Sequence, residues 1–72
     1  MSLKLKELRE HNNKSQSEIA EVLNIKQQQY FRYEKEIRKI QIDYLIQLAK
    51  YYNTSTDYIL GITEEKTPYR KI

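Results

Sequence analysis

Residues 15–34 read SQSEIAEVLNIKQQQYFRYE, and this stretch decides the fold. Ser15 and Glu18 have the spacing of a capping box, in which each side chain bonds an otherwise unpaired backbone amide at the start of a helix. Apolar residues then recur at helical spacing as far as Asn24, a residue type that tolerates the left-handed backbone that ends helices. The sequence therefore predicts a short helix over residues 16–23.

A second helix follows almost at once, from about residue 26 to residue 35. Tyr30 and Tyr33 are three residues apart on one face of it, and we expect both to be core residues with solvated hydroxyl groups. Two helices joined by so short a turn cannot pack antiparallel and must cross steeply. The pattern therefore predicts a helix-turn-helix unit.

The rest of the chain also reads as helical. Apolar spacing predicts a first helix around Leu5 and Leu8, and a fourth from Ile42 whose apolar positions include Leu45, Ala49 and Tyr52. Ser55 can cap a last short helix that runs to Leu60, and Gly61 can stop it. We expect an all-α domain of five helices over residues 1–62. The aperiodic segment 63–72 is expected to be a loosely ordered tail or a contact for a second copy or a partner.

Composition narrows the function without fixing it. The 72 residues include no cysteine, which excludes a disulfide framework and a thiolate metal site. Thirteen Lys and Arg against ten Asp and Glu give a net charge of +3, which permits an anionic partner without requiring one. No stretch has the apolar length of a signal peptide or a membrane span, so we expect a cytoplasmic protein.

The two long segments LKELREHNNKSQSEIAEVLNIKQQQYFRYEKEIRK and IDYLIQLAKYYNTSTDYILG resemble the Cro and phage-repressor type of helix-turn-helix domain, the XRE family. The likeness covers Leu5 to Gly61 and is most specific in SQSEIAEVLNI with the RYE that follows it. It implies a compact, five-helix, lambda-repressor-like DNA-binding domain with the helix-turn-helix at about residues 16–35. The second helix of such a unit enters the major groove.

The resemblance assigns roles along that second helix. It places Gln27 and Gln28 at the two leading base-contacting positions, and Arg32 one turn beyond Gln28 on the same face. Glutamine can pair with adenine and arginine with guanine through two hydrogen bonds each. Phe31 either contacts a thymine methyl group or folds back on its helix or on a partner subunit. Phosphate contacts are expected from Gln16, Lys26, Lys35, Arg38 and Lys39, although any single lysine can equally be a solvated surface charge.

Three positions bear on how firmly this arrangement is held. The resemblance implies that Arg9 pairs with Glu34, which would lock the first helix onto the recognition helix. Lys26 stands where the family favours Ser or Thr, so the recognition helix lacks a side-chain cap. Glu36 stands where the family has glycine, which leaves the path of the following loop open.

The function predicted from these features is sequence-specific binding of a double-stranded DNA operator by a transcriptional regulator, a repressor of phage, plasmid or mobile-element type that acts as a homodimer. The alternative is an antitoxin or protein-interaction module whose C-terminal tail binds a partner. With one histidine and no glycine-rich loop we expect no enzyme, and no cofactor, metal, small-molecule ligand or membrane. The candidate dimer surface comprises Ile59, Ile62, Tyr69 and Ile72, although Ile59 could instead close the core.

Overall fold

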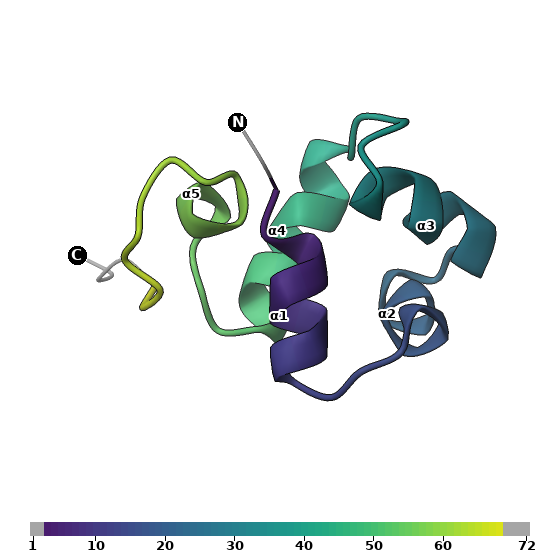
Figure 1. Ribbon diagram of the computed structural model, residues 1–72, viewed down its shortest axis with the longest axis horizontal. Coiled ribbons are helices and arrows are strands. Elements are labelled where there is room, and N and C mark those ends of the chain that lie inside the picture. The colour runs from purple at the N-terminus through teal and green to yellow at the C-terminus, as the bar shows by residue number, and fades with distance from the viewer. Residues whose placement is uncertain (1–2, 69–72) are drawn as a thin grey trace.

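The computed structural model describes residues 3–68, and within that range the chain forms α-helices and no strand (Figure 1). The helices are α1 (Leu5–His11), α2 (Gln16–Leu23), α3 (Gln27–Glu34), α4 (Ile42–Tyr51) and α5 (Thr56–Ile59). The predicted all-α class is therefore confirmed. Figure 1 places α2 and α3 on one side of α1 and α5 on the other. In the described part of the chain, no helix combines the length and hydropathy that crossing a membrane requires.

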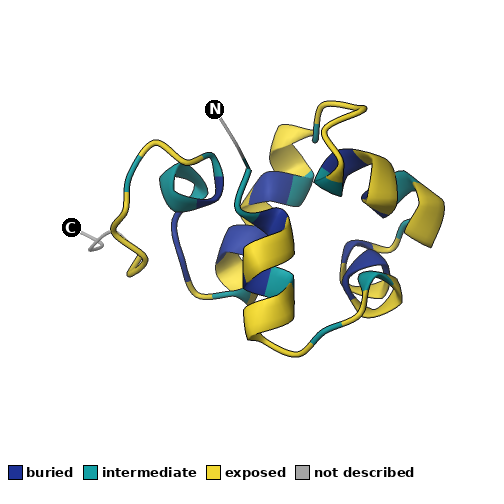
Figure 2. Ribbon diagram, in the orientation of Figure 1, coloured by how far each residue is buried: buried dark blue, intermediate teal, exposed yellow. Residues whose placement is uncertain are grey.

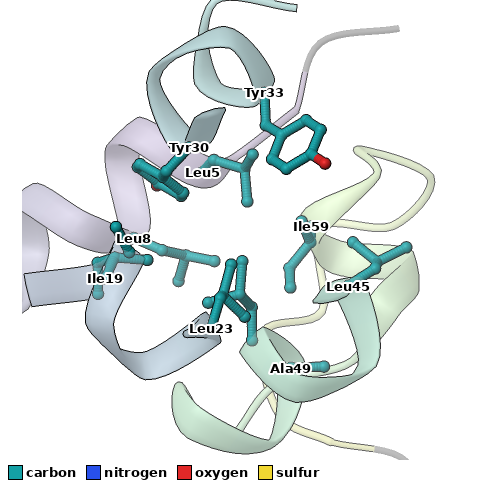
Figure 3. Close-up of a cluster of buried hydrophobic side chains, with 11 residues drawn as sticks. Leu5, Leu8, Ile19, Leu23, Tyr30, Tyr33, Leu45, Ala49 and Ile59 are labelled. Atoms are coloured by element: carbon teal, nitrogen blue, oxygen red, sulfur yellow. The ribbon is translucent and has the colours of Figure 1, made fainter. Parts of the chain in front are cut away.

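One apolar face from each helix contributes to a single core, drawn in Figure 3. Tyr30 and Tyr33 are buried in it, as predicted from their spacing, but the Tyr30 hydroxyl is buried as well, so the expectation that it is solvated is wrong. Because burying side chains of this size removes a large apolar area from water, these two tyrosines are the main anchors of α3. The buried core residues are Leu5, Leu8, Ile19, Ala20, Leu23, Tyr30, Tyr33, Leu45, Leu48, Ala49 and Ile59.

Two apolar positions differ from expectation. Ile42 is 63% exposed although it shares a helix face with the buried Ala49, because it is the first residue of α4 and burial on that face begins one turn later, at Leu45. Ile59 is fully buried, so its prediction as dimer surface is wrong and the alternative, that it closes the core, holds. Its carbonyl oxygen also accepts a 2.8 Å hydrogen bond from the Lys4 amide, which ties the start of the described chain to α5.

The starts of α2 and α5 are fixed by serine caps. Ser15 Oγ accepts from the Glu18 amide at 3.1 Å, and the Ser15 amide donates to Glu18 Oε1 at 3.0 Å, so the predicted capping box is present. Ser55 Oγ accepts from the Tyr58 amide at 3.0 Å at the start of α5. Each bond satisfies a backbone group that has no partner inside its own helix.

Every helix in the described range ends in the same way. A residue with positive φ follows the last turn, and the next amide donates to the carbonyl five residues earlier at 2.8–3.0 Å, which is the Schellman motif. Asparagine and glycine adopt this backbone at low cost, whereas a glutamate pays a steric penalty. The positive-φ residues are Asn13, Asn24, Glu36, Asn53 and Gly61. The motif reverses the chain within a few residues, which keeps the connections short.

Candidate nucleic-acid interface

The turn between α2 and α3 sets the angle between the two helices. Asn24 has φ 56°, and the amide of Ile25 donates to the Ala20 carbonyl at 2.9 Å. Ile25 packs against the core and Lys26 then continues in extended backbone at the start of α3. Figure 1 shows α2 almost end-on where α3 runs across the view, so the helices cross steeply. The structure thus contains the predicted helix-turn-helix unit.

The recognition helix, α3, divides into an inner and an outer face. Tyr30 and Tyr33 hold the inner face in the core. Gln29 is half-buried, and its Nε2 donates to the Tyr33 hydroxyl at 2.8 Å. The outer face is exposed (Figure 2) and carries the four side chains predicted to contact bases, namely Gln27, Gln28, Phe31 and Arg32. The helix therefore presents a mainly polar surface to solvent.

A hollow of about 510 Å³ lies between α3 and the loop that leads to α4. Gln28 and Arg32 line it from the helix, and Arg38 and Lys39 line it from the loop. The described lining residues include four cations and no carboxylate; they are Lys26, Gln28, Gln29, Arg32, Tyr33, Arg38, Lys39 and Gln41. A concave surface lined by one sign of charge concentrates anions. The predicted base contacts Gln28 and Arg32 thus share one surface with three of the predicted phosphate contacts.

The loop reaches this position because Glu36 adopts the left-handed backbone that glycine adopts most easily. Glu36 has φ 58°, and the amides of Ile37 and Arg38 then both donate to the Arg32 carbonyl, at 2.9 and 3.3 Å. These bonds bring the loop back beside the end of α3. Arg38 and Lys39 consequently line the hollow, which settles the loop path that the missing glycine left open.

Gln27 and Phe31 lie outside the hollow, on the rest of the outer face. Gln27 Oε1 accepts a 2.9 Å hydrogen bond from Ser17 Oγ of α2. Phe31 is 38% exposed, and Lys35 Nζ lies 5.8 Å from its ring centroid, a cation–π arrangement that partly covers it. Lys35, predicted to contact phosphate, is therefore placed over the aromatic ring and does not line the hollow.

The remaining predicted phosphate contacts lie at the two helix starts. Lys26 makes no side-chain capping bond at the start of α3 within the described residues, as expected from its residue type. Gln16, at the start of α2, donates through Nε2 to Glu34 Oε1 at 3.3 Å. One amide proton of Gln16 is therefore used inside the protein, and the second is left for an external acceptor.

Arg9 and Glu34 form the ion pair that the resemblance implies. Arg9 Nε donates to Glu34 Oε2 at 2.9 Å and Arg9 Nη2 donates to Oε1 at 2.8 Å, while Nη1 donates to the Lys14 carbonyl at 3.0 Å. The two side chains are only 13% and 2% exposed. With Gln16, this network joins α1, the start of α2 and the inner side of α3. Bidentate geometry of this kind is directional and strong.

Burial and hydrogen bonding shift the pKa of Glu34 in opposite directions. Burial would raise the pKa of Glu34, but the hydrogen bonds from Arg9 first, and then the Tyr30 hydroxyl beside it and the bond from Gln16, outweigh burial and lower that pKa from its ordinary value. The same hydrogen bond to Glu34 raises the pKa of Arg9. Burial, followed by the interaction with Glu34, raises the pKa of the Tyr30 hydroxyl. At neutral pH the charged pair is therefore the stable state of the site.

Sequence reasoning missed Ser17 and Gln41, and it left the dimer surface largely open. Nothing marked Ser17 beyond its place in SQSE, ten residues before Gln27. Of the candidate dimer residues, Ile62 is 60% exposed, whereas Tyr69 and Ile72 lie outside the described residues. Within residues 3–68, no group of three or more His, Cys, Asp or Glu side chains is placed to hold a metal ion.

A steeply crossing helix pair with a polar, exposed second helix defines the class of helix-turn-helix domains. The helix-turn-helix family matches residues 5–59, and the chain belongs to it, so the predicted resemblance is confirmed. The chain is 37% identical over 65 residues to the uncharacterized HTH-type transcriptional regulator YobD of Bacillus subtilis (strain 168), a match covering 90% of this chain and 58% of that protein. It is 43% identical over 61 residues to the HTH-type transcriptional regulator ImmR of the same strain, covering 85% of this chain and 48% of that protein. The chain thus spans about half the length of these curated relatives. No solved structure matches it.

Proposed function

We propose that this protein is a transcriptional regulator that binds double-stranded DNA at specific sequences through α3. The observation that carries the proposal is the hollow in which Gln28 and Arg32 lie among Lys26, Arg38 and Lys39. Glutamine and arginine present the donors and acceptors that base edges require, and the surrounding cations suit phosphates. Both relatives are named HTH-type transcriptional regulators, which supports the same assignment.

In this proposal α3 enters the major groove with its inner face held by the core. Gln28 and Arg32, four residues apart, read neighbouring base edges from one side of the helix, and Gln27 reads from the other. Phe31, partly covered by Lys35, offers apolar contact to a thymine methyl group. Gln16, Lys26, Lys35, Arg38 and Lys39 supply phosphate contacts, and the charge of the four basic residues among them makes the affinity depend on salt.

The finer parts of the proposal concern assembly and context. We take the regulator to be a cytoplasmic repressor that binds as a homodimer to two half-sites about one helical turn apart, the arrangement that domains of this type adopt. Ile62 is exposed and available for such an interface, next to the proposed boundary between the domain (1–62) and the tail (63–72). Lys66 in that tail accepts a hydrogen bond through its carbonyl from Thr54 Oγ1.

The test is selection of bound duplexes from a random library, with affinity then measured across salt concentration. We expect an enriched motif. Gln28→Ala should relax the preference at one base pair and leave the salt slope unchanged, whereas Arg38→Ala should weaken all duplexes and flatten the slope by about one. Lys50→Ala is the matched control, because Lys50 is exposed and does not line the hollow. If no motif is enriched and salt alone governs affinity, sequence-specific reading is wrong and a protein-interaction role becomes the better account.

A further inference from the structure

A single hydrogen bond joins the outer sides of the two helices of the motif. Ser17, the second residue of α2, donates from Oγ to Oε1 of Gln27, the first residue of α3, at 2.9 Å. Both residues are exposed, so this bond forms at the surface that faces solvent and not in the core. The bond therefore involves Gln27, one of the side chains that are proposed to contact bases.

The bond engages one end of the Gln27 amide, the oxygen Oε1, and leaves the other end, the nitrogen Nε2, without a protein partner among the described residues. A free glutamine can offer Oε1 as acceptor and Nε2 as donor together, which is the pattern that pairs with adenine N6 and N7. In this structure Oε1 accepts the serine proton with one of its two lone pairs, which holds the oxygen toward α2, and the two Nε2 protons have no partner within residues 3–68. With its oxygen held toward α2, the end of the Gln27 amide that is left to turn toward a base edge is therefore the donor, Nε2.

The next residue provides an internal comparison. Gln28 has the same side chain, is exposed, and makes no side-chain hydrogen bond within residues 3–68. It keeps both ends of its amide available and can pair with adenine in the two-bond geometry. Two adjacent glutamines of one sequence run thus differ in what they can recognise, and the difference comes from α2.

We propose that Ser17 is a specificity-determining residue that makes Gln27 read guanine in preference to adenine. Guanine presents two acceptors, N7 and O6, at its major-groove edge, which suits a donor end, whereas adenine presents one acceptor and one donor. Ser17 acts by holding the Gln27 amide oxygen and is a positioning residue, not itself a base contact. The inference rests on the proposed function and adds the base preference at one position.

The experiment compares wild type, Ser17→Ala, Ser17→Thr and Gln27→Ala on duplexes derived from the selected motif. The base pair that Gln27 faces is the one at which Gln27→Ala relaxes the preference, and four duplexes that differ only there give the relative affinities. Ser17 is exposed and alanine is the strongest helix former, so Ser17→Ala is expected to fold, which its melting curve checks. Threonine keeps the hydroxyl and serves as the conservative variant.

We expect wild type and Ser17→Thr to favour guanine over adenine at that base pair by at least about fivefold, the lower limit for a good base contact. Ser17→Ala should lose or reverse this preference and leave the preference at the Gln28 base pair unchanged. A wild-type preference for adenine, or an unchanged preference in Ser17→Ala, overturns the inference. A motif that responds to Gln28→Ala but not to Gln27→Ala also overturns it and leaves the proposed function intact, whereas the absence of any motif overturns both.

Discussion

Replacing Arg9 with methionine tests how much the buried ion pair contributes to the domain. The substitution keeps most of the apolar stem and removes three hydrogen bonds, two to Glu34 and one to the Lys14 carbonyl. It leaves a carboxylate only 2% exposed, with the 3.3 Å bond from Gln16 and the Tyr30 hydroxyl as its remaining neighbours. Stranding one partner of a buried pair costs about 3–5 kcal/mol, and the lower end applies because Arg9 itself is partly exposed.

That loss is large for a chain of this size. At about 0.05–0.15 kcal/mol per residue, 72 residues give a total stability of roughly 4–11 kcal/mol. A loss of about 3 kcal/mol lowers the Tm of a small domain by roughly 12–24 °C. We therefore expect Arg9→Met to be folded in the cold and substantially unfolded at temperatures at which the wild type is stable.

The stability that Arg9→Met loses should also depend on pH, and the direction of that dependence follows from the pKa of Glu34. In the wild type the pKa of Glu34 is lowered from its ordinary value, so the pair contributes its full stability above the pKa of the unfolded chain and loses it as the pH falls through the folded pKa. In Arg9→Met burial acts without the guanidinium and raises that pKa, so the stranded carboxylate takes up a proton as the pH falls. The difference in stability between wild type and variant should therefore be larger at pH 7 than at pH 4.

Urea unfolding followed by far-ultraviolet circular dichroism at both pH values measures this difference. Lys6→Met is the matched control, since it removes an exposed cation from the same helix and should stay within about 0.5 kcal/mol of wild type. Glu34→Gln should cost less than Arg9→Met at pH 7, because it strands a more exposed group. A loss in Arg9→Met no larger than in the control, or equal at pH 7 and pH 4, would refute the reasoning.

The helix ends yield two further predictions that need only thermal and urea unfolding. Ser15→Ala removes the side-chain acceptor of the capping box and should cost about 1 kcal/mol, with a proportional fall in Tm; an unchanged Tm would mean that the cap contributes nothing. Glu36→Gly removes the steric cost of a left-handed glutamate and should raise the free energy of unfolding, measured with urea, by about 0.5–1 kcal/mol. Asn24→Gly, at a position with nearly the same φ, should leave the free energy of unfolding almost unchanged. Equal effects of the two glycine substitutions would contradict a steric cost specific to glutamate.

The helix boundaries were predictable because they depend on local chemistry. Ser15 with Glu18 starts a helix, and Asn24 or Gly61 ends one, through bonds among residues close in sequence. Glu36 shows the limit of that argument. Its residue type does not favour positive φ, yet it ends α3 as an asparagine or glycine would, because the bonds of Ile37 and Arg38 to the preceding helix hold it there.

Burial at the edges of the domain was less predictable. The four residues of α5 are too few to show a period, so the sequence could not decide whether Ile59 faced solvent or core. Ile42 has the spacing of a core position, but it is the first residue of α4, and burial on that face begins one turn later, at Leu45. Both outcomes depend on how helices pack, which one-dimensional spacing does not contain.

The candidate site was also predictable only in part. Polar residues on the outer face of α3 were evident from spacing, whereas the bond from Ser17 to Gln27 exists only because α2 and α3 cross. The grouping of Gln28 and Arg32 with Arg38 and Lys39 likewise depends on the return of the loop. Residue identity thus indicates what a side chain can bind, and tertiary structure decides which of its atoms are left to bind it.

The buried contacts of α3 and its exposed outer face move together, because they are opposite faces of the same eight-residue helix. A helix of two turns is marginal by itself, so α3 takes its position from tertiary contacts. Those contacts are the buried rings of Tyr30 and Tyr33 and the bonds from Glu34 to Arg9. Because Arg32 lies between Tyr30 and Tyr33 in sequence, any movement of the inner face moves the outer face by a similar distance. In the proposed function the ion pair therefore supports DNA recognition through geometry, although neither of its members is placed to touch a base.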